Sequence, residues 1–490
     1  MKVLIGTDVL LSYLQRQELE GILLAFEWIE RLKAKKFTDL SSIAILTNFV
    51  SLDSFDDLSS FEVLEGVRPK ARVIENFEQS NIRLNKFDFR PLLAQLNWLF
   101  YQDIDFLITE NRMSHGIAKQ LGVDDKVFTI ENFIEKCSFE HQDLDETRGV
   151  AIEKVKLGEL DYDDRFFNTF KAEYEPYYHV WFEKKKNDDV YVAKDLKGKI
   201  RGLLKLKVEE SMDDFGNIKP VFAPAKRLKI CSFKADFTSQ KLGQRFMRII
   251  FDIAIQKSVT EIYVTLFQNS SQRRRLVGMI EQWGFAYYGT KDEKEQVFVR
   301  SFRKELSGNP KLSYPYCSPQ KGCFLIPINY QYAVQLLPPS NCEGTTEIEP
   351  MKQAIKKVLI MSKENKNIKN GAVLLFVENN EQNNMVKLIS LGIVENVYRR
   401  FHKEVDFINR CRKRSCFSNN ILHDFWVSTS EKPIVVDFLY AYHFEKEFTK
   451  TDWERMNLKG LCGQNPLMID EVDVSLLIKN TPYEKIIVAN

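Results

Sequence analysis

The chain has 490 residues, and its 70 Lys and Arg against 68 Asp and Glu give a formal net charge of +2. A chain of this length is expected to form about two to four domains. The content of 44% hydrophobic and 28% charged residues is typical of a soluble globular protein. The near-neutral charge excludes a chain that is basic throughout, so any nucleic-acid surface would have to be a local patch.

The cysteines and the N-terminus do not indicate export. The eight cysteines are scattered without a repeated CxxC spacing, so we expect free thiols. A zinc site is the alternative, with Cys317, Cys323, Cys411 and Cys416 and two histidines as candidate ligands. Asp8 interrupts the first apolar run, which is unlike a secretory signal, and no run is long enough to span a membrane. We therefore expect a cytoplasmic protein with no membrane partner.

Residues 1–140 alternate between strand and helix patterns. Alternating strands and helices predict a mainly parallel sheet, in which ligands lie at the carboxyl ends of the strands. The predicted elements are a strand at Lys2–Ile5, a helix from Ile22 to Leu32, a strand at Asp105–Thr109, a helix at Ser114–Leu121 that Gly122 ends, a strand at Lys126–Thr129 and a helix at Glu131–Cys137.

Two stretches of this region, VLIGTDVLL and DFLITENRMSHGIAKQLGVDDKVFTIENF, resemble PIN domains, a nuclease-type fold with carboxylates around a divalent metal. The resemblance implies Mg²⁺ or Mn²⁺ bound by Asp8, Asp88 and Glu110. The family places aspartates where this chain has Gly6 and Asn111. We therefore interpret the region as a PIN-like domain that is degenerate or docks RNA, and an active nuclease is the alternative. Asp8 can also be read as a helix-capping residue.

Residues 150–304 begin a different pattern, with a strand, helices and further strands followed by strand, glycine turn, helix and strand. This last order offers backbone N–H groups and a helix N-terminus to a phosphate. The predicted elements are a strand from Ala151, helices between Asp163 and Phe182, strands at Val190–Ala193, Ile200–Val208 and Leu228–Ala235, a helix through Phe246 and Ala254, a strand at Ile262–Phe267, a helix at Gln272–Trp283 and a strand after the Gly284–Phe285 pair.

The order and spacing resemble the acetyl-CoA-binding core of the GNAT N-acetyltransferases. The segment QKLGQR keeps the first residue and the central glycine of the family's pyrophosphate loop, and has Arg245 at its last place. An arginine there must swing outward or contact phosphate itself, and Lys241 adds positive charge beside a helix N-terminus. Alternatively, Gly243 only relieves crowding at the helix start. The resemblance implies acetyl-CoA as the cofactor, bound by Phe233, Ala235, Gln240, Lys241, Leu242, Gly243, Gln244 and Arg245.

The catalytic groups are less clearly marked. Where the family often has a tyrosine, four residues before the Gly-Phe pair, this chain has Ile280. Glu209 and Glu210 end the strand that would face the acceptor amine, and either is a candidate general base, directly or through water. Tyr288 follows the Gly-Phe pair and is the candidate acid. Alternatively, the two glutamates are a solvated strand end and the tyrosine pairs strands. The run Arg273–Arg275 is either a solvated face or a phosphate contact.

Residues 312–490 follow a linker rich in Pro, Gly and Ser and are β-rich. Short strands around few helices predict a small closed barrel. The predicted elements are strands at Cys323–Ile328, Ala354–Met361, Ala372–Val377, Lys387–Val397 and Val435–Phe444 and a helix at Glu404–Arg414.

Several of these stretches, such as FLIPINYQYAVQLLP, AIKKVLIM and IKNGAVLLFVEN, resemble the PUA-like barrels of the ASCH group, found attached to GNAT domains in bacterial predicted regulators or toxins. The resemblance implies an RNA role. Independently, aromatic residues interleave with basic ones, which suits stacked single-stranded bases. The alternative places the aromatics in the core and the arginines in solvent. The candidate nucleic-acid residues are Arg399, Arg400, Arg410, Arg412, Lys413 and Arg414.

Together these patterns predict a multidomain α/β plus α+β protein, with a PIN-like parallel sheet (1–140), a GNAT mixed sheet (150–304) and a PUA-like β-barrel (312–490). The function that we predict is acetyl-CoA-dependent N-acetyl transfer to an RNA-associated acceptor, in a toxin, defence or regulatory protein with RNA and possible antitoxin-type protein partners. The alternatives are a metal-dependent PIN-type endoribonuclease with a CoA-sensing domain, and a non-catalytic RNA-binding adaptor.

Overall fold

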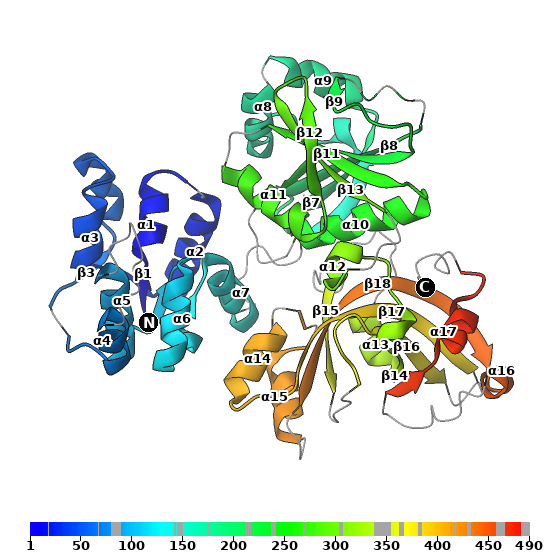
Figure 1. Cartoon of the computed structure of the whole chain (residues 1–490). Helices are drawn as coiled ribbons and strands as arrows, with labels where there is room; N and C mark the ends of the chain where they lie inside the picture. Colours follow the sequence, from blue (N-terminus) through cyan, green and yellow to red (C-terminus); the bar gives the residue numbers. More distant parts are fainter. Residues whose placement is uncertain are drawn as a thin grey trace. The chain divides into compact units, whose positions relative to one another are not determined.

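The computed structural model describes the chain except for residues 18, 67, 80–89, 142–143, 145–149, 175, 212, 214, 216, 237–241, 268–270, 303–306, 338–353, 362–366, 381–384, 413, 416, 429–432, 457–465 and 482–490. The chain divides into two compact units, one made chiefly of Met1–Glu146 and the other chiefly of Thr147–Asp236 and Gln240–Asn490 (Figure 1). None of the helices within the described ranges combines the length and the apolar character that crossing a membrane requires.

The first unit contains a five-stranded sheet in the order β3-β2-β1-β4-β5, and every pairing in it is parallel, as the sequence predicts. The strands are β1 (Lys2–Ile5), β2 (Lys35–Asp39), β3 (Glu62–Leu64), β4 (Phe106–Ile108) and β5 (Val127–Phe128). The helices are α1 (Thr7–Leu14), α2 (Leu19–Arg31), α3 (Leu40–Leu46), η1 (Leu52–Leu58), α4 (Arg72–Gln79), α5 (Arg90–Phe100), α6 (Arg112–Leu121), η2 (Asp124–Lys126) and α7 (Ile130–Glu140).

Both faces of this sheet are covered, which explains why its central strands β1 and β4 are mostly apolar. Val3 and Ile5 of β1 point into a core that includes residues of α1, α2 and α7. Leu4 points into the opposite core, with residues of α4, α5 and α6. Successive side chains of a strand point to opposite faces, so a single short strand serves both cores. Gly122 ends α6 in the left-handed conformation with φ +70°, as predicted.

The second unit begins with an eight-stranded mixed sheet in the order β6-β7-β8-β10-β11-β13-β12-β9. Only the neighbouring strands β10 and β11 pair in parallel among the pairings that the structure describes in this sheet. The strands are β6 (Ala151–Lys156), β7 (Asp189–Lys194), β8 (Ile200–Glu209), β9 (Ile218–Lys219), β10 (Arg227–Ala235), β11 (Glu261–Phe267), β12 (Ala286–Lys291) and β13 (Glu295–Ser301). The helices are η4 (Leu157–Glu159), η5 (Arg165–Phe167), α8 (Asn168–Tyr174), α9 (Tyr177–Lys185), α10 (Leu242–Gln256) and α11 (Ser271–Gln282).

The C-terminal part of this unit is a six-stranded sheet in the order β15-β18-β17-β16-β14-β19. The strands are β14 (Cys323–Pro327), β15 (Lys356–Met361), β16 (Val373–Asn380), β17 (Met385–Tyr398), β18 (Ile434–Thr449) and β19 (Leu467–Ile469). The helices are α12 (Pro310–Ser313), η6 (Pro319–Lys321), α13 (Tyr330–Leu336), α14 (Glu404–Arg412), α15 (Asn419–Ser428), α16 (Lys450–Arg455) and α17 (Glu471–Ile478).

Among the described strands, the end strands β15 and β19 do not pair with each other, so these pairings do not close the predicted barrel, which stays a prediction. The sheet is built on two long strands, β17 and β18, whose register shifts at three points. Register shifts of this kind bend a strand and increase its twist. At one of them, Gly392 leaves room for a ring: a Cβ there would lie 2.5 Å from Cδ2 of Phe438.

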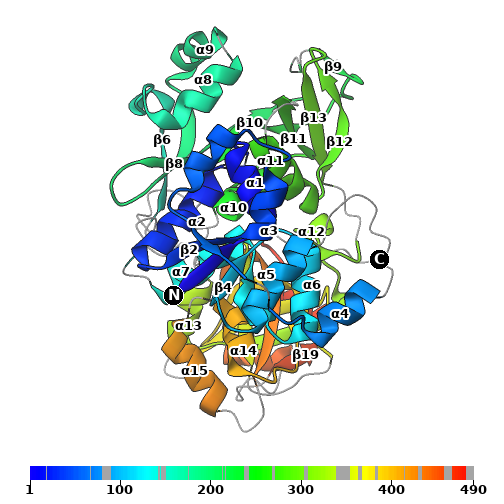
Figure 2. The same ribbon diagram turned by 90° about the vertical axis from the view of Figure 1, so that its left-hand side faces the viewer.

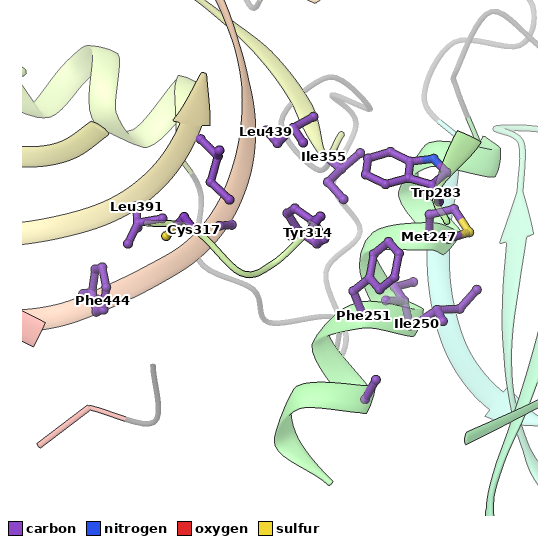
Figure 3. Packing of buried hydrophobic residues seen from close by; sticks show 14 of the residues in the cluster. Met247, Ile250, Phe251, Trp283, Tyr314, Cys317, Ile355, Leu391, Leu439 and Phe444 are labelled. Atoms are coloured by element: carbon purple, nitrogen blue, oxygen red, sulfur yellow. The ribbon is translucent and has the colours of Figure 1, made fainter. Parts of the chain in front are cut away.

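Helix α10 joins the two sheets of the second unit through one hydrophobic core. On one side it covers the mixed sheet, with Phe246 and Ile250 buried against strand residues. On the other side, Phe251 and Trp283 face Tyr314, and Ile355, Leu391 and Leu439 of the C-terminal sheet lie beyond (Figure 3). The helix is therefore buried on nearly all sides, which explains why even its charged residues are inaccessible. These are Arg245, Arg248 and Asp252.

Candidate functional site

The parallel strands β10 and β11 separate partway along their length. They pair only from Arg227 opposite Glu261 to Ile230 opposite Val264, although β10 continues to Ala235 and β11 to Phe267. The register between β10 and β8 shifts at the same point, so Cys231 is a bulge residue. In Figure 2, β6 and β8 lie on one side and β11 to β13 on the other. Beyond the bulge, the backbone edge of β10 that faces β11 is not paired with any described residue of β11. An extended ligand with amide groups can form hydrogen bonds along this edge.

The N-terminus of α10 follows β10 after residues 237–241, which lie outside the described part of the chain, as do the predicted cofactor residues Gln240 and Lys241. A helix N-terminus offers unpaired N–H groups and a positive dipole end to an anion. Leu242 is buried and Gln244 is half-buried. A Cβ on Gly243 would lie 2.7 Å from Sδ of Met279 on α11. The glycine therefore lets these two helices approach each other, whether or not a phosphate binds.

Three predicted cofactor residues point their side chains away from this edge. Arg245 was expected to swing outward or to contact phosphate, but it is only 1% exposed and its Nη1 donates to the carbonyl oxygen of Val150 at 2.8 Å. The side chain is therefore turned into the protein, where the backbone just before β6 engages it. Phe233 packs edge-on against the ring of Phe246 on α10, with ring centroids 5.7 Å apart. Ala235 likewise packs against the α10 side of the sheet, so both can offer only backbone groups.

The opposite face of the mixed sheet carries a polar strip around the point where β10 and β11 separate. Lys207 of β8 lies directly opposite Lys229 of β10, which in turn lies opposite Tyr263 of β11. Glu209, at the end of β8, is 3% exposed. One of its oxygens accepts a hydrogen bond from the hydroxyl of Tyr263 at 2.6 Å, and the other accepts one from Nζ of Lys207 at 3.1 Å. The predicted base is thus a buried carboxylate held between two donors.

The ionisation of this strip follows from burial and from the charge of Glu209. Burial raises the pKa of the Tyr263 hydroxyl, and its hydrogen bond to Glu209 raises it further. Burial alone would lower the pKa of Lys207, but the hydrogen bond and charge of Glu209 outweigh it and the pKa is raised. Burial also raises the pKa of the Cys231 thiol, against the opposing effect of nearby lysines. Near neutral pH, tyrosine and thiol therefore keep their protons and Lys207 keeps its charge.

Aromatic side chains flank the polar strip on both sides. On the α9 side, Lys205 is 2.7 Å from Asp188 and its Nζ lies 5.4 Å from the ring of Trp181. On the other side, the guanidinium of Arg227 lies 4.2 Å from the ring of Phe222 and also forms an ion pair with a carboxylate of β11. The strip can therefore be approached between two aromatic walls.

The other two predicted catalytic residues lie at the margin of the strip. Glu210 is exposed and forms an ion pair with Lys226 at 3.1 Å. The hydroxyl of Tyr288 donates to the carbonyl oxygen of Val221 at 3.2 Å, and its ring packs on Phe222 at 4.8 Å. Tyr288 thus holds the segment before β10 against the sheet. The residues that sequence reasoning missed are Tyr263, Lys207 and Lys229, although alternate lysines in LKLKVE could have indicated a polar face of a buried strand.

The predicted metal ligands of the first unit have structural partners. Asp8, near the start of α1, accepts hydrogen bonds from Oγ1 of Thr109 at 2.9 Å and from the backbone N–H of Glu110 at 2.7 Å. Glu110 accepts one from the backbone N–H of Ile130 at 2.8 Å and so caps α7. Burial raises the pKa of Asp8 despite these bonds. Asp88 lies outside the described residues.

The same edge of the first sheet has little room for the missing carboxylate. A Cβ on Gly6 would lie 2.5 Å from Oδ1 of Asp8 and 2.9 Å from the carbonyl oxygen of Ile108. Nearby, Nε2 of Gln95 donates to Asp39 at 3.2 Å and to Ser42 at 2.9 Å, which forms a buried polar network with a single carboxylate. Over the ranges that the structure describes, no three acidic, His or Cys residues gather as a metal site would require.

The predicted nucleic-acid cluster is largely internal. Arg410 and Arg414 both form ion pairs with the fully buried carboxylate of Asp437, and the Arg410 guanidinium lies 3.7 Å from the ring of Tyr398. Arg399 donates to a backbone carbonyl. Arg400 is exposed, while the Arg412 side chain and Lys413 lie outside the described residues. The interleaved aromatics are core residues: Phe407 is 0% and Phe417 7% exposed. Arg410 and Arg414 therefore share one buried carboxylate inside the protein, and nucleic-acid binding by the cluster stays a prediction. The cysteines Cys137, Cys231, Cys317, Cys323 and Cys411 are free thiols, as expected.

Neither a protein-family model nor a curated protein matches the chain. Solved structures of three kinds are similar to parts of it. A protein described as ASCH from Zymomonas mobilis is 9% identical with a TM-score of 0.25, and the match covers 33% of this chain and 96% of the other. A GNAT family acetyltransferase from Elizabethkingia anophelis with acetyl-CoA bound is 13% identical with a TM-score of 0.22, and the match covers 31% of this chain and 98% of the other.

A PilT N-terminus domain protein from the archaeon Sulfolobus solfataricus is 16% identical with a TM-score of 0.19, and the match covers 28% of this chain and 93% of the other. The TM-scores of all three lie far below 0.5.

Proposed function

We propose that the mixed sheet of the second unit binds acetyl-CoA where β10 and β11 separate, and transfers its acetyl group to an amine. The observation that carries the proposal is the loss of pairing between β10 and β11 after Ile230, on a strand that leads along the chain to the N-terminus of α10 and that has the buried Glu209 opposite Arg227. The free edge of β10 suits the amide groups of the pantetheine arm, and the helix N-terminus suits the pyrophosphate. Acetyl-CoA supplies the acetyl group as an activated thioester.

The residues of the chain contribute position, polarity and a proton acceptor. Backbone N–H groups of β10 beyond Cys231 polarise the acyl carbonyl, because they are fixed donors at an edge that β11 leaves unpaired. Glu209 accepts the proton of the acceptor ammonium, directly or through one water. The hydroxyl of Tyr263 holds one oxygen of Glu209, which leaves the carboxylate oriented toward Lys207 and the strip.

Cofactor binding is tested by calorimetric titration with acetyl-CoA together with alkylation of Cys231. This thiol lies at the bulge and is half-buried, whereas Cys137 is only 3% exposed in the first unit. We expect acetyl-CoA to slow the reaction of Cys231 with iodoacetamide at least fivefold, read as modified peptide by mass spectrometry, without a change at Cys137. No heat and no protection at millimolar acetyl-CoA would overturn the proposal.

A blocking variant locates the binding site. Gly243→Trp closes the N-terminus of α10 and should abolish the titration heat. The matched control is Gly116→Trp, because Gly116 lies in a helix of the first unit and an added Cβ there meets nothing within 4 Å. An equal loss of titration heat in both variants would show that the size of the introduced side chain, and not its position at α10, abolishes binding.

Turnover is tested by the release of free thiol from acetyl-CoA in the presence of amines. Glu209→Gln should leave acetyl-CoA affinity unchanged and lower kcat by about 10²-fold or more, the usual contribution of a general base. Unchanged kcat in this variant would remove Glu209 from the mechanism.

That the acceptor is carried by RNA, and that a protein partner controls the chain, stays a prediction. Two of the arginines on which the RNA prediction partly rested, Arg410 and Arg414, are engaged with Asp437.

A further inference from the structure

The polar strip contains three lysines beside the proposed acyl site. The charges of Lys205, Lys207 and Lys229 act on the Cys231 thiol at the bulge, as does the carboxylate of Glu209. Lys205 is paired with Asp188 at 2.7 Å and Lys207 with Glu209 at 3.1 Å. The charge of Asp213 also acts on Lys207.

The third lysine of the strip is Lys229. Among the residues that the structure describes, Lys229 has no carboxylate partner, and its Nζ instead lies 5.6 Å from the ring of Tyr263. It stands directly opposite Lys207 across the β8–β10 pair. Like charges in this position destabilise a sheet, because the two Cβ atoms lie only about 5 Å apart. Lys229 is half-buried, so its charge is screened less than that of a lysine in open solvent, whereas Lys207 is exposed.

A bound anion relieves this repulsion. We propose that the acetyl acceptor carries a negatively charged group close to its amine, and that Lys229 binds that group. The inference rests on the proposed function, since it assigns the acceptor side of the same site.

Strand geometry limits the distance between the two groups of the acceptor. Lys229 precedes the bulge at Cys231 by two residues, which corresponds to roughly 7 Å along a strand. With the flexible lysine reaching toward the bulge, the anion and the amine lie a few bonds apart. Short amino acids and aminoalkyl phosphates have this arrangement. A polyamine does not, and its further ammonium groups would meet Lys207 and Lys229.

Acceptor pairs that differ only in the anion test the inference. We compare glycine with glycinamide and phosphoethanolamine with ethanolamine, using thiol release, so that the carboxylate and phosphate sources are separated. The wild type should prefer the anionic member of at least one pair by tenfold or more in kcat/KM. Lys229→Met should reduce this preference to within about twofold through KM, and Lys229→Arg should retain it.

Lys226→Met is the matched control, because Lys226 lies just before β10 and pairs with the exposed Glu210 outside the strip. It should leave the preference unchanged. A preference for the neutral members, or an anionic preference that survives Lys229→Met, would overturn the inference while the acetyltransferase proposal stands.

A second measurement does not need turnover. Acylation of Lys229 by a water-soluble succinimidyl ester is followed by mass spectrometry with inorganic phosphate, with acetate, or with chloride at equal ionic strength. Phosphate or acetate should slow the reaction of Lys229 at least threefold and leave Lys226 unaffected. Protection without any turnover supports the anion site and counts against the proposed function. Absence of both protection and anionic preference refutes the inference.

Discussion

The replacement Phe251→Ala tests whether α10 joins the two sheets of the second unit into one cooperative structure. Phe251 is fully buried. Its ring lies 5.6 Å from that of Trp283 in the mixed-sheet part and 5.0 Å from that of Tyr314 in the segment leading to the C-terminal sheet. The guanidinium of Arg300 lies 4.4 Å from the same ring. One side chain thus serves both parts of the core.

Removing a buried phenyl ring costs about 3–5 kcal/mol of unfolding free energy, through lost burial and the cavity that remains. We expect a value toward the upper end for Phe251→Ala. Arg300 loses the ring beside it, although its hydrogen bonds to the backbone carbonyls of Trp283 and Tyr314 stay in place. Urea unfolding followed by circular dichroism measures the loss. Phe49→Ala, at a position 60% exposed in the first unit, is the matched control and should change the free energy by less than about 0.5 kcal/mol.

Hydrogen exchange supplies the decisive readout. Since the core is shared, amides of β17 and β18 should lose protection together with those of β10 and β11. A stability loss below about 1 kcal/mol, or faster exchange confined to the mixed sheet, would refute the reasoning.

Three further predictions concern buried charges. Burial raises the pKa of Asp252 to about 6, so the folded protein favours the protonated carboxyl group. The stability that comes from this preference is complete below the ordinary pKa of aspartate and is lost as the pH rises through about 6. Asp252→Asn should therefore flatten the pH dependence of Tm and raise the free energy of unfolding by roughly 3 kcal/mol near pH 7.5. An unchanged dependence of Tm on pH would contradict this prediction. Asp8→Ala removes two hydrogen bonds and should destabilise the first unit by about 1–3 kcal/mol, as urea unfolding measures, while acetyl-CoA binding, followed by calorimetry, stays unchanged. Arg414→Met should lower the free energy of unfolding by about 2–4 kcal/mol, measured by thermal unfolding, because the buried charge of Asp437 then loses one of its two arginine partners. Arg400→Met, at an exposed position, should not lower it. Weaker RNA binding by Arg414→Met without a loss of stability would contradict the internal role of Arg414.

Periodicity predicted the parallel sheet of the first unit and most strands of the mixed sheet in their order along the chain, because these depend on local pattern. Lys2–Ile5 and Ile262–Phe267 are apolar runs bounded by turn residues, and both are strands within a residue of the predicted ends. Bulges and strand separation leave no comparable pattern, so the edge beyond Ile230 became visible only in three dimensions.

The charged residues of the candidate sites were the least predictable. Arg245 at a helix start looks like a phosphate ligand, but its side chain is buried and donates to the carbonyl oxygen of Val150, 95 positions earlier in the chain. Arg410 and Arg414 look like a basic patch until β18 brings Asp437 beneath them. Glu209 was found because it ends a strand, whereas Tyr263, its hydrogen-bond donor, lies 54 positions away in the chain. Such pairs depend on strand register, which the order of residues alone does not reveal.

The burial of α10 also determines how this protein can be divided for experiments. A fragment ending near residue 304 would contain the whole mixed sheet and still expose Met247, Phe251 and Trp283, which Tyr314 and the C-terminal sheet cover in the full chain. An apolar surface of that kind promotes association in water. Biochemical work on the mixed sheet therefore needs the C-terminal sheet attached, and its inactivity as an isolated fragment would carry no information about acetyl transfer.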